Sequence, residues 1–166
     1  MIPSTLEVLE KDTFLECRRL SSVTFAEGSR LREIGPNCFA FTGLRAFEAP
    51  PSLRKIDRGV FYCCQNLQYL VLNEGLEALG EDDEESCNEV GFFEYSGLKE
   101  IVLPGTLVKL GRNAFQQCRS LKRVWIEQRC QIRIKDYLQP EVDVRVFRAG
   151  DESLLRHIRN GAANDE

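Results

Sequence analysis

The 166-residue chain has the length of one domain, and a body of this size buries roughly 70% of the surface of its unfolded chain. Its 26 acidic and 22 basic residues give a net charge of −4 without any dense basic run, which argues against nucleic acid as a partner. No uncharged apolar stretch approaches the roughly 20 residues of a membrane span, and the N-terminus lacks the basic and apolar regions of a signal peptide.

A pattern built on one phenylalanine recurs five times along the chain. A small residue follows each Phe after three positions, and a Leu follows after five or six. The phenylalanines are Phe14, Phe39, Phe61, Phe93 and Phe115, and the small residues are Cys17, Thr42, Cys64, Ser96 and Cys118. The following leucines are spaced by 24, 23, 31 and 23 residues, and self-similarity at such a period predicts a solenoid.

Each repeat contains two short apolar phrases. The first, L-x-x-apolar-x-apolar, predicts one strand per repeat, over 20–25, 44–49, 67–72, 98–103 and 121–126. The second, L-x-x-[IL], follows at 31–34, 53–56, 76–79 and 107–110, and 6–9 fits the same place. Because every repeat runs the same way, we expect the strands to be parallel and the phenylalanines to stack in a column.

The two ends and one insertion depart from the pattern. Residues 1–9 superpose on 102–110, so we expect residue 1 to be a truncation point or an unusual edge, with a natural start as the alternative. The 31-residue interval places an acidic insertion over 81–89, which predicts a surface loop. After residue 126, segments 131–134 and 142–147 alternate like strands, and Asp151 is suited to cap a short helix carrying Leu154, Leu155 and Ile158. We therefore expect 127–166 to form a C-terminal cap of strands and a short helix.

The positions beside the central apolar residue of each strand point away from the core. Toward the C-terminus they become aromatic and apolar, and they define the predicted partner-binding surface: Tyr69, Val71, Glu100, Val102, Arg123 and Trp125. Tyr, Arg and Trp are enriched in interface hot spots. Two other interpretations stay open, namely that scattered apolar residues on a sheet are ordinary and that the cap covers Trp125.

The seven cysteines divide into two groups. Cys17, Cys64 and Cys118 share one repeat position with Thr42 and Ser96, which predicts small residues buried between repeats. The other four, Cys38, Cys63, Cys87 and Cys130, are irregularly placed, and their disulfide status stays open. Cys17, Cys64 and Cys118 are 47 and 54 residues apart and form none of the paired ligands of a structural zinc site, so no metal or other cofactor is expected.

Catalytic constellations are lacking in the sequence. The single histidine, His157, is expected on the solvent side of the terminal helix. No nucleophile elbow, zinc-protease motif or phosphate-binding glycine loop occurs. The acidic residues of 81–85 are contiguous, whereas a calcium loop spaces its carboxylates around a glycine. We therefore expect a protein that is not an enzyme.

The repeat is clearest over 98–121, as L-x-x-I-x-L-P-x-x-L-x-x-I/L-G-x-x-A-F-x-x-C-x-x-L, and it resembles the BspA-like leucine-rich repeats of microbial surface antigens. The resemblance covers about residues 2–126 and divides the chain into five leucine-rich repeats over 1–126, the first truncated, and the cap over 127–166. It implies a right-handed α/β-type solenoid, mostly β, shaped as a horseshoe or slab with parallel strands on the concave face. The departures are the insertion, Thr42, Ser96 and Ala49.

The resemblance also implies a function in adhesion or protein recognition, without catalytic residues. We expect the partner to be a host or self protein bound at the sheet surface. The alternative is a structural or self-assembling segment of a longer protein, paired edge to edge with another copy. The family is mostly found on cell surfaces, but the sequence itself leaves the compartment and the ligand open.

Overall fold

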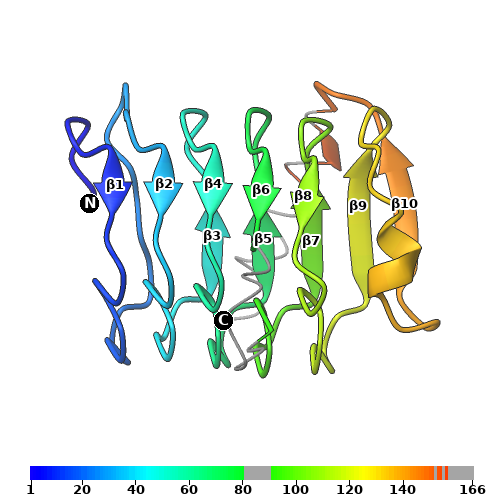
Figure 1. Cartoon of the computed structure of the whole chain (residues 1–166), viewed down its shortest axis with the longest axis horizontal. Coiled ribbons are helices and arrows are strands. Elements are labelled where there is room, and N and C mark those ends of the chain that lie inside the picture. The colour runs from blue at the N-terminus through cyan, green and yellow to red at the C-terminus, as the bar shows by residue number, and fades with distance from the viewer. Residues whose placement is uncertain (81–90, 152, 155, 157–166) are drawn as a thin grey trace.

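The computed structural model describes residues 1–80, 91–151, 153–154 and 156, and it forms a right-handed solenoid of parallel strands (Figure 1). Two five-stranded sheets lie on opposite sides of it, and in each sheet the strands pair in the order in which the repeats follow one another. The longer strands are β3 (Ala46–Glu48), β5 (Tyr69–Val71), β7 (Glu100–Leu103), β9 (Arg123–Glu127) and β10 (Asp143–Phe147). The shorter strands are β1 (Val8–Leu9), β2 (Glu33–Ile34), β4 (Lys55–Ile56), β6 (Ala78–Leu79) and β8 (Lys109–Leu110).

The sheet of shorter strands corrects the expectation of one strand per repeat. Each of its strands is formed by the last two residues of the L-x-x-[IL] phrase, and the final Leu or Ile is buried in every one. Two residues are too few to show the alternation by which a strand is recognised in sequence. The strands exist because each phrase lies beside its counterpart in the next repeat, as in the pairing of Ile56 with Leu79.

Two segments expected to be strands are not. Segment 20–25 makes a single parallel bridge, between Phe25 and Ile2, and the first full strand of the longer sheet is β3. Residues 131–133 are irregular, and a 3₁₀ turn, η1 (Ile134–Tyr137), follows them and buries Ile134. Both segments lie at an end of the solenoid, where a repeat stands on one side only. The alternating segment 142–147 does contain a strand, β10, which pairs with β9.

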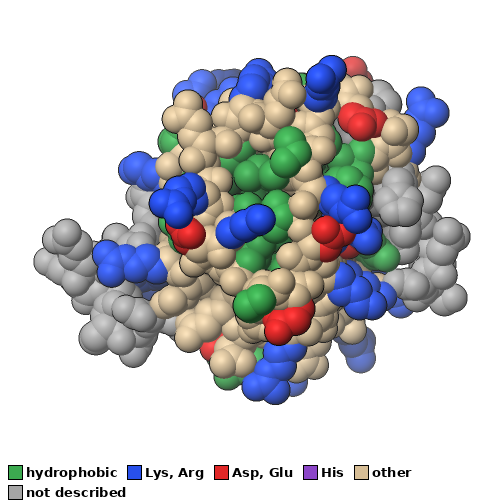
Figure 2. All heavy atoms as spheres, turned by 90° about the vertical axis from the view of Figure 1, so that its right-hand side faces the viewer, with side chains coloured by type: hydrophobic (Ala, Val, Ile, Leu, Met, Phe, Trp, Pro, Cys, Tyr) green, Lys and Arg blue, Asp and Glu red, His purple; other side chains and the backbone are tan. Residues whose placement is uncertain are grey.

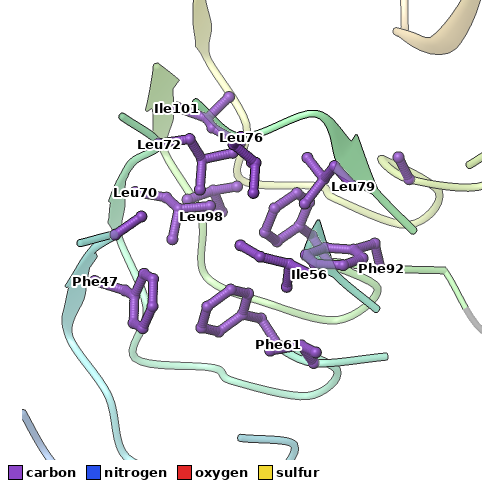
Figure 3. Close-up of a cluster of buried hydrophobic side chains, with 14 of the residues drawn as sticks. Phe47, Ile56, Phe61, Leu70, Leu72, Leu76, Leu79, Phe92, Leu98 and Ile101 are labelled. Atoms are coloured by element: carbon purple, nitrogen blue, oxygen red, sulfur yellow. The ribbon is translucent and has the colours of Figure 1, made fainter. Parts of the chain in front are cut away.

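The predicted phenylalanine column is confirmed. Successive rings lie nearly parallel, with centroid distances of 5.3, 6.0, 5.9 and 5.6 Å from Phe14 to Phe115. Phe47 from β3 meets the edge of Phe61 at 5.0 Å, and Leu and Ile side chains from both sheets fill the space around them (Figure 3). The stack therefore runs as one continuous core through the solenoid.

The residue two places after each column phenylalanine has a left-handed backbone. The φ angles are 60° at Glu16, 57° at Phe41, 55° at Cys63, 58° at Tyr95 and 55° at Gln117. Left-handed residues other than glycine are uncommon. Here neighbouring repeats support the conformation, because the N–H of Phe41 donates to the carbonyl of Tyr62 and the N–H of Cys63 donates to that of Glu94.

The turn that follows has two lengths. Where the small residue is Thr42 or Ser96, a glycine comes next and the strand leucine follows one residue earlier than in the other repeats. A Cβ atom at Gly43 or Gly97 would overlap a backbone carbonyl oxygen of the preceding repeat. Glycine is therefore required where the shorter turn brings the backbones of two neighbouring repeats close together.

The insertion leaves the stacking undisturbed. The predicted insertion, 81–89, lies outside the described part of the chain. On either side of it, Leu79 pairs with Leu110 across the shorter sheet, and Phe61 stacks on Phe93 at 5.9 Å. The repeat frame is therefore the same before and after it.

Candidate functional site: the outer face of the longer sheet

The outer face of the longer sheet consists of the side chains that point away from the phenylalanine column. The strand register places them in rows across the sheet. One row contains Ala46, Tyr69, Glu100, Arg123 and Asp143, and the next contains Glu48, Val71, Val102, Trp125 and Arg145. All six residues of the predicted partner-binding surface thus lie together in two adjacent rows.

A polar cluster occupies the C-terminal part of this face. Arg123 lies between two carboxylates, with its Nη1 3.0 Å from Glu100 Oε1 and its Nε 3.3 Å from Asp143 Oδ2. The Trp125 indole N–H donates to Glu100 Oε2 at 2.8 Å, and the Arg123 guanidinium lies 5.4 Å from the Trp125 ring centroid. Cross-strand pairs of this kind fix side chains on a sheet surface. Arg123, Glu100 and Trp125 therefore hold one another in place on the sheet surface.

Asp143 links this cluster to β10. Its Oδ2 also accepts a hydrogen bond from Arg145 Nε at 2.8 Å. The pKa of the Asp143 carboxyl lies below its ordinary value, mainly because of the hydrogen bond from Arg145. Burial acts in the opposite direction, and the hydrogen bond from Arg123 lowers the pKa further. The carboxylate thus stays charged and keeps Arg123 in place.

Val71 and Val102 point outward as expected, yet they are buried. Their exposed fractions are 4% and 2%, because Leu154 from the C-terminal segment packs on them. Tyr69, Trp125 and Phe147 surround this contact and remain half-buried. Leu154 therefore covers the two valines, whereas Trp125, which one interpretation placed beneath the predicted cap, packs beside this contact and is half-buried. Whether the face binds a partner stays a prediction.

Glu127 fastens the end of β9 to the turn that leads to Leu154. It is buried, with 1% of its surface exposed. Its Oε2 accepts hydrogen bonds of 2.9 Å from the N–H and from Nε of Arg129, and Oε1 accepts one of 3.4 Å from the N–H of Ala149. Burial alone would raise the pKa of this carboxyl, but the bonds from Arg129 and Ala149 outweigh it and lower the pKa.

The sequence matches the model of the BspA-type leucine-rich repeat region in six copies, over residues 1–91 and 86–138. The chain belongs to the BspA-type leucine-rich repeat family. Leucine-rich repeat regions are commonly protein-interaction modules and are typically not enzymes. No curated protein matches the sequence.

Several solved bacterial structures share the fold of this leucine-rich repeat protein. The pneumococcal vaccine antigen PcpA is 28% identical with a TM-score of 0.68, and the match covers 78% of this chain and 30% of PcpA. A leucine-rich repeat protein from Eubacterium ventriosum is 19% identical with a TM-score of 0.65, covering 76% and 31% of the two chains. The T. pallidum leucine-rich repeat protein TpLRR is 22% identical with a TM-score of 0.56, covering 93% and 76%. The chain thus spans about a third of the length of the first two.

The cysteines of the leucine-rich repeats are thiols with structural contacts. Cys64 Sγ donates to the Phe39 carbonyl at 3.0 Å, and Cys118 Sγ donates to that of Phe93 at 3.2 Å. Thr42 Oγ1 donates to the Phe39 carbonyl of its own repeat at 2.8 Å. At Thr42, Cys64 and Cys118 the position therefore uses a hydrogen-bond donor as well as small size, which sequence reasoning missed, whereas the buried hydroxyl of Ser96 has no such partner.

Cys17 departs from the expected burial, because it is exposed at the N-terminal end of the solenoid. Among the described cysteines, all six are free thiols, including Cys38, Cys63 and Cys130, whereas Cys87 lies outside the described residues. Burial raises the pKa of the Cys38 and Cys118 thiols to about 12.

The described residues offer no cluster of three His, Cys, Asp or Glu side chains able to hold a metal ion. Within the same residues, no helix has the length and apolar character needed to cross a membrane. His157 and the acidic run 81–85 lie outside the described part of the chain.

Sequence reasoning missed two contributions to the outer face. Asp143 and Arg145 join it because β10 extends the longer sheet, and the only signal was the alternation of 142–147. Leu154 was expected on a short helix capped by Asp151, and that cap forms, since Asp151 Oδ1 accepts a hydrogen bond of 3.2 Å from the N–H of Leu154. Nothing in the sequence indicated that Leu154 would pack on Val71 and Val102.

Proposed function

We propose that this leucine-rich repeat protein is a non-enzymatic recognition module that binds a protein partner through the outer face of its longer sheet. The observation that carries the proposal is the cluster of Arg123, Trp125 and Glu100, with Tyr69 beside Glu100 in the same row. Aromatic and arginine side chains dominate the energetics of protein interfaces. Because the cluster's polar groups already pair with one another, a partner meets an ordered surface, and binding requires little further ordering of side chains.

A role in adhesion is the more specific form of the proposal. Its support is the similarity to PcpA, a pneumococcal vaccine antigen, over 78% of this chain. The chain covers only 30% of PcpA, so the inference concerns the shared repeat region.

The test starts from affinity capture with the full chain and mass spectrometry of the retained proteins, followed by isothermal titration with each purified partner. We expect Tyr69→Ala with Trp125→Ala to weaken binding by at least about 30-fold, since a hot-spot residue contributes about 2 kcal/mol or more. Circular dichroism is expected to show that the double variant stays folded.

Lys109→Ala supplies the matched control, because Lys109 is exposed on β8 of the opposite sheet. It is expected to leave the affinity unchanged. If a purified partner binds the double variant and the wild-type protein equally tightly, the proposal that it binds at the outer face is wrong.

A second candidate function is self-assembly, favoured by the apolar side chains at both ends of the solenoid. Phe14, Val23 and Phe25 are only half-buried at the N-terminal end, and Val146 of β10 is 69% exposed at the other. Figure 2 views the C-terminal end, where apolar side chains gather in the centre between charged groups. Because β10 is the last strand of its sheet, copies stacked end to end would continue both the sheet and the core.

Light scattering over a dilution series separates the two candidates. Self-assembly predicts a mass that falls on dilution, and Val146→Lys is expected to abolish the larger species. A constant monomer mass at all concentrations would leave recognition of another protein as the only candidate.

A further inference from the structure

A second apolar cluster lies on the outer face, separated from the main core by the sheet itself. Val71, Val102 and Leu154 form its centre, with 4%, 2% and 6% of their surfaces exposed. Tyr69, Trp125 and Phe147 pack around them. We call the surface made by Val71, Val102 and these three aromatic residues the leucine seat. It lies inside the face to which the proposed function assigns the partner.

The described residues of the segment that fills the leucine seat contact it through one side chain, Leu154. The chain leaves β10 through an exposed turn in which Gly150 has a φ of 83°. Asp151 then begins a helical segment, because its Oδ1 accepts hydrogen bonds of 3.2 Å from the N–H of Leu154 and 2.6 Å from the hydroxyl of Ser153. Ser153 and Arg156 are exposed, so Leu154 is the single buried anchor among the described residues of this segment.

The polar groups around the seat are paired with one another and not with the described residues of that segment. Glu100, Arg123 and Asp143 pair with one another, and the Trp125 indole N–H is bonded to Glu100. None of these bonds involves residues 151–156. The valines stand on β5 and β7, whose backbones are fixed by the sheet. Departure of Leu154 therefore uncovers a preformed apolar site rimmed by satisfied polar groups.

We propose that the partner of this face presents a leucine on a short helical segment, and that Leu154 is an intramolecular occupant which the partner displaces. The inference rests on the proposed function and names the chemistry that the face recognises. A helix laid on an apolar surface by one or two anchors is a recurring mode of peptide recognition. A tethered occupant competes at a high effective concentration, so it sets a threshold that a partner must exceed.

The test uses the full chain and a synthetic peptide with the sequence of residues 148–160, acetylated and amidated. Trp125 is the only tryptophan and forms part of the leucine seat, so its fluorescence reports occupancy. The peptide is titrated into the wild type and into Leu154→Ala. We expect the variant to bind the peptide at least about tenfold more tightly, because its own anchor no longer competes for the apolar surface.

Two controls make the result specific. A peptide carrying Leu154→Ala is expected to bind the Leu154→Ala protein at least about tenfold more weakly than the natural peptide. Asp151→Ala keeps the leucine and removes the helix cap, so this protein is expected to bind the natural peptide with an affinity between those of the wild type and Leu154→Ala. Thermal melting of each variant verifies that the solenoid is intact.

Equal peptide affinity for the wild type and Leu154→Ala would overturn the proposal, as would equal binding of the two peptides. If that occurs while Tyr69→Ala with Trp125→Ala still weakens a purified partner, only the leucine seat is wrong. If the peptide behaves as expected but purified partners bind that double variant as tightly as the wild type, the proposed recognition function is wrong instead.

Discussion

The middle of the solenoid and its N-terminal end use the same residues with different results. Cys64 is buried and donates to a backbone carbonyl of the preceding repeat, whereas Cys17 in the same repeat position is exposed. Phe61 is fully buried between two stacked rings, while Phe14 has one such neighbour and stays half-buried. The repeat motif alone therefore does not create a buried position. Burial comes from the repeats on both sides, as expected for a solenoid stabilised by nearest-neighbour contacts.

Among substitutions that compare the middle with the end, those in the phenylalanine column are expected to differ most in their effect on the free energy of unfolding. Phe61→Ala should lower the free energy of unfolding by about 3–5 kcal/mol, because the cavity would lie among four aromatic rings. Phe14→Ala should cost less than about half of that, since its ring already meets solvent on one side. Urea unfolding followed by circular dichroism measures both, and equal losses would contradict the comparison.

A backbone test within the middle repeats is expected to have the next largest effect. Gly97→Ala should cost about 1–3 kcal/mol, because the added Cβ would overlap the Gln65 carbonyl oxygen and force the turn apart. Asn66 holds the matching position before the strand leucine of the longer turn and is exposed. Asn66→Ala should therefore stay within about 0.5 kcal/mol of the wild type in the same urea experiment.

The C-terminal end is expected to show a smaller effect that depends on pH. The folded state lowers the pKa of Glu127, so its ionised form stabilises the fold above the ordinary carboxyl pKa, and this contribution is lost as pH falls through the lowered value. Melting temperatures of Glu127→Gln and the wild type should differ at pH 7 and converge in acid. Glu141→Gln, at an exposed position, should show little difference at either pH.

The reactivity of the thiols compares the repeats of the solenoid with its N-terminal end without any substitution. With iodoacetamide at pH 8, mass spectrometry should find Cys17 alkylated first, because it is exposed. Cys118 should react on the order of a thousandfold more slowly than an ordinary thiol, since its pKa is raised to about 12. Urea should abolish the difference. Rapid labelling of Cys118 in the native protein would show that its repeat opens readily.

Much of the fold could be predicted because the same residue types recur at the same positions of each repeat. The recurring order of Phe, small residue and Leu is enough to place the column and the strands β3, β5, β7 and β9, since each copy supports the same interpretation. The shorter sheet escaped because two-residue strands have no period of their own. The left-handed residues escaped as well, since Glu16, Phe41 and Cys63 share no side-chain property, and the backbone N–H of each donates to a carbonyl of the next repeat.

The outer face was predictable only in part for a related reason. Strand alternation was sufficient to place Tyr69, Glu100 and Arg123 on one row. The burial of Val71 and Val102 depends on a contact with Leu154, more than 50 residues further along the chain. This contact lies outside the periodic pattern of the sequence, so only the three-dimensional structure identifies it.

The unbroken register across the insertion has a practical consequence for protein engineering. Leu79 and Leu110 pair as the other repeats do, although the segment between their repeats is longer than elsewhere. The stacking of the repeats thus tolerates a longer chain between β6 and Phe93. This interval is therefore a suitable place to insert a foreign sequence, such as an epitope tag or a reporter peptide, while the repeats on either side keep their packing.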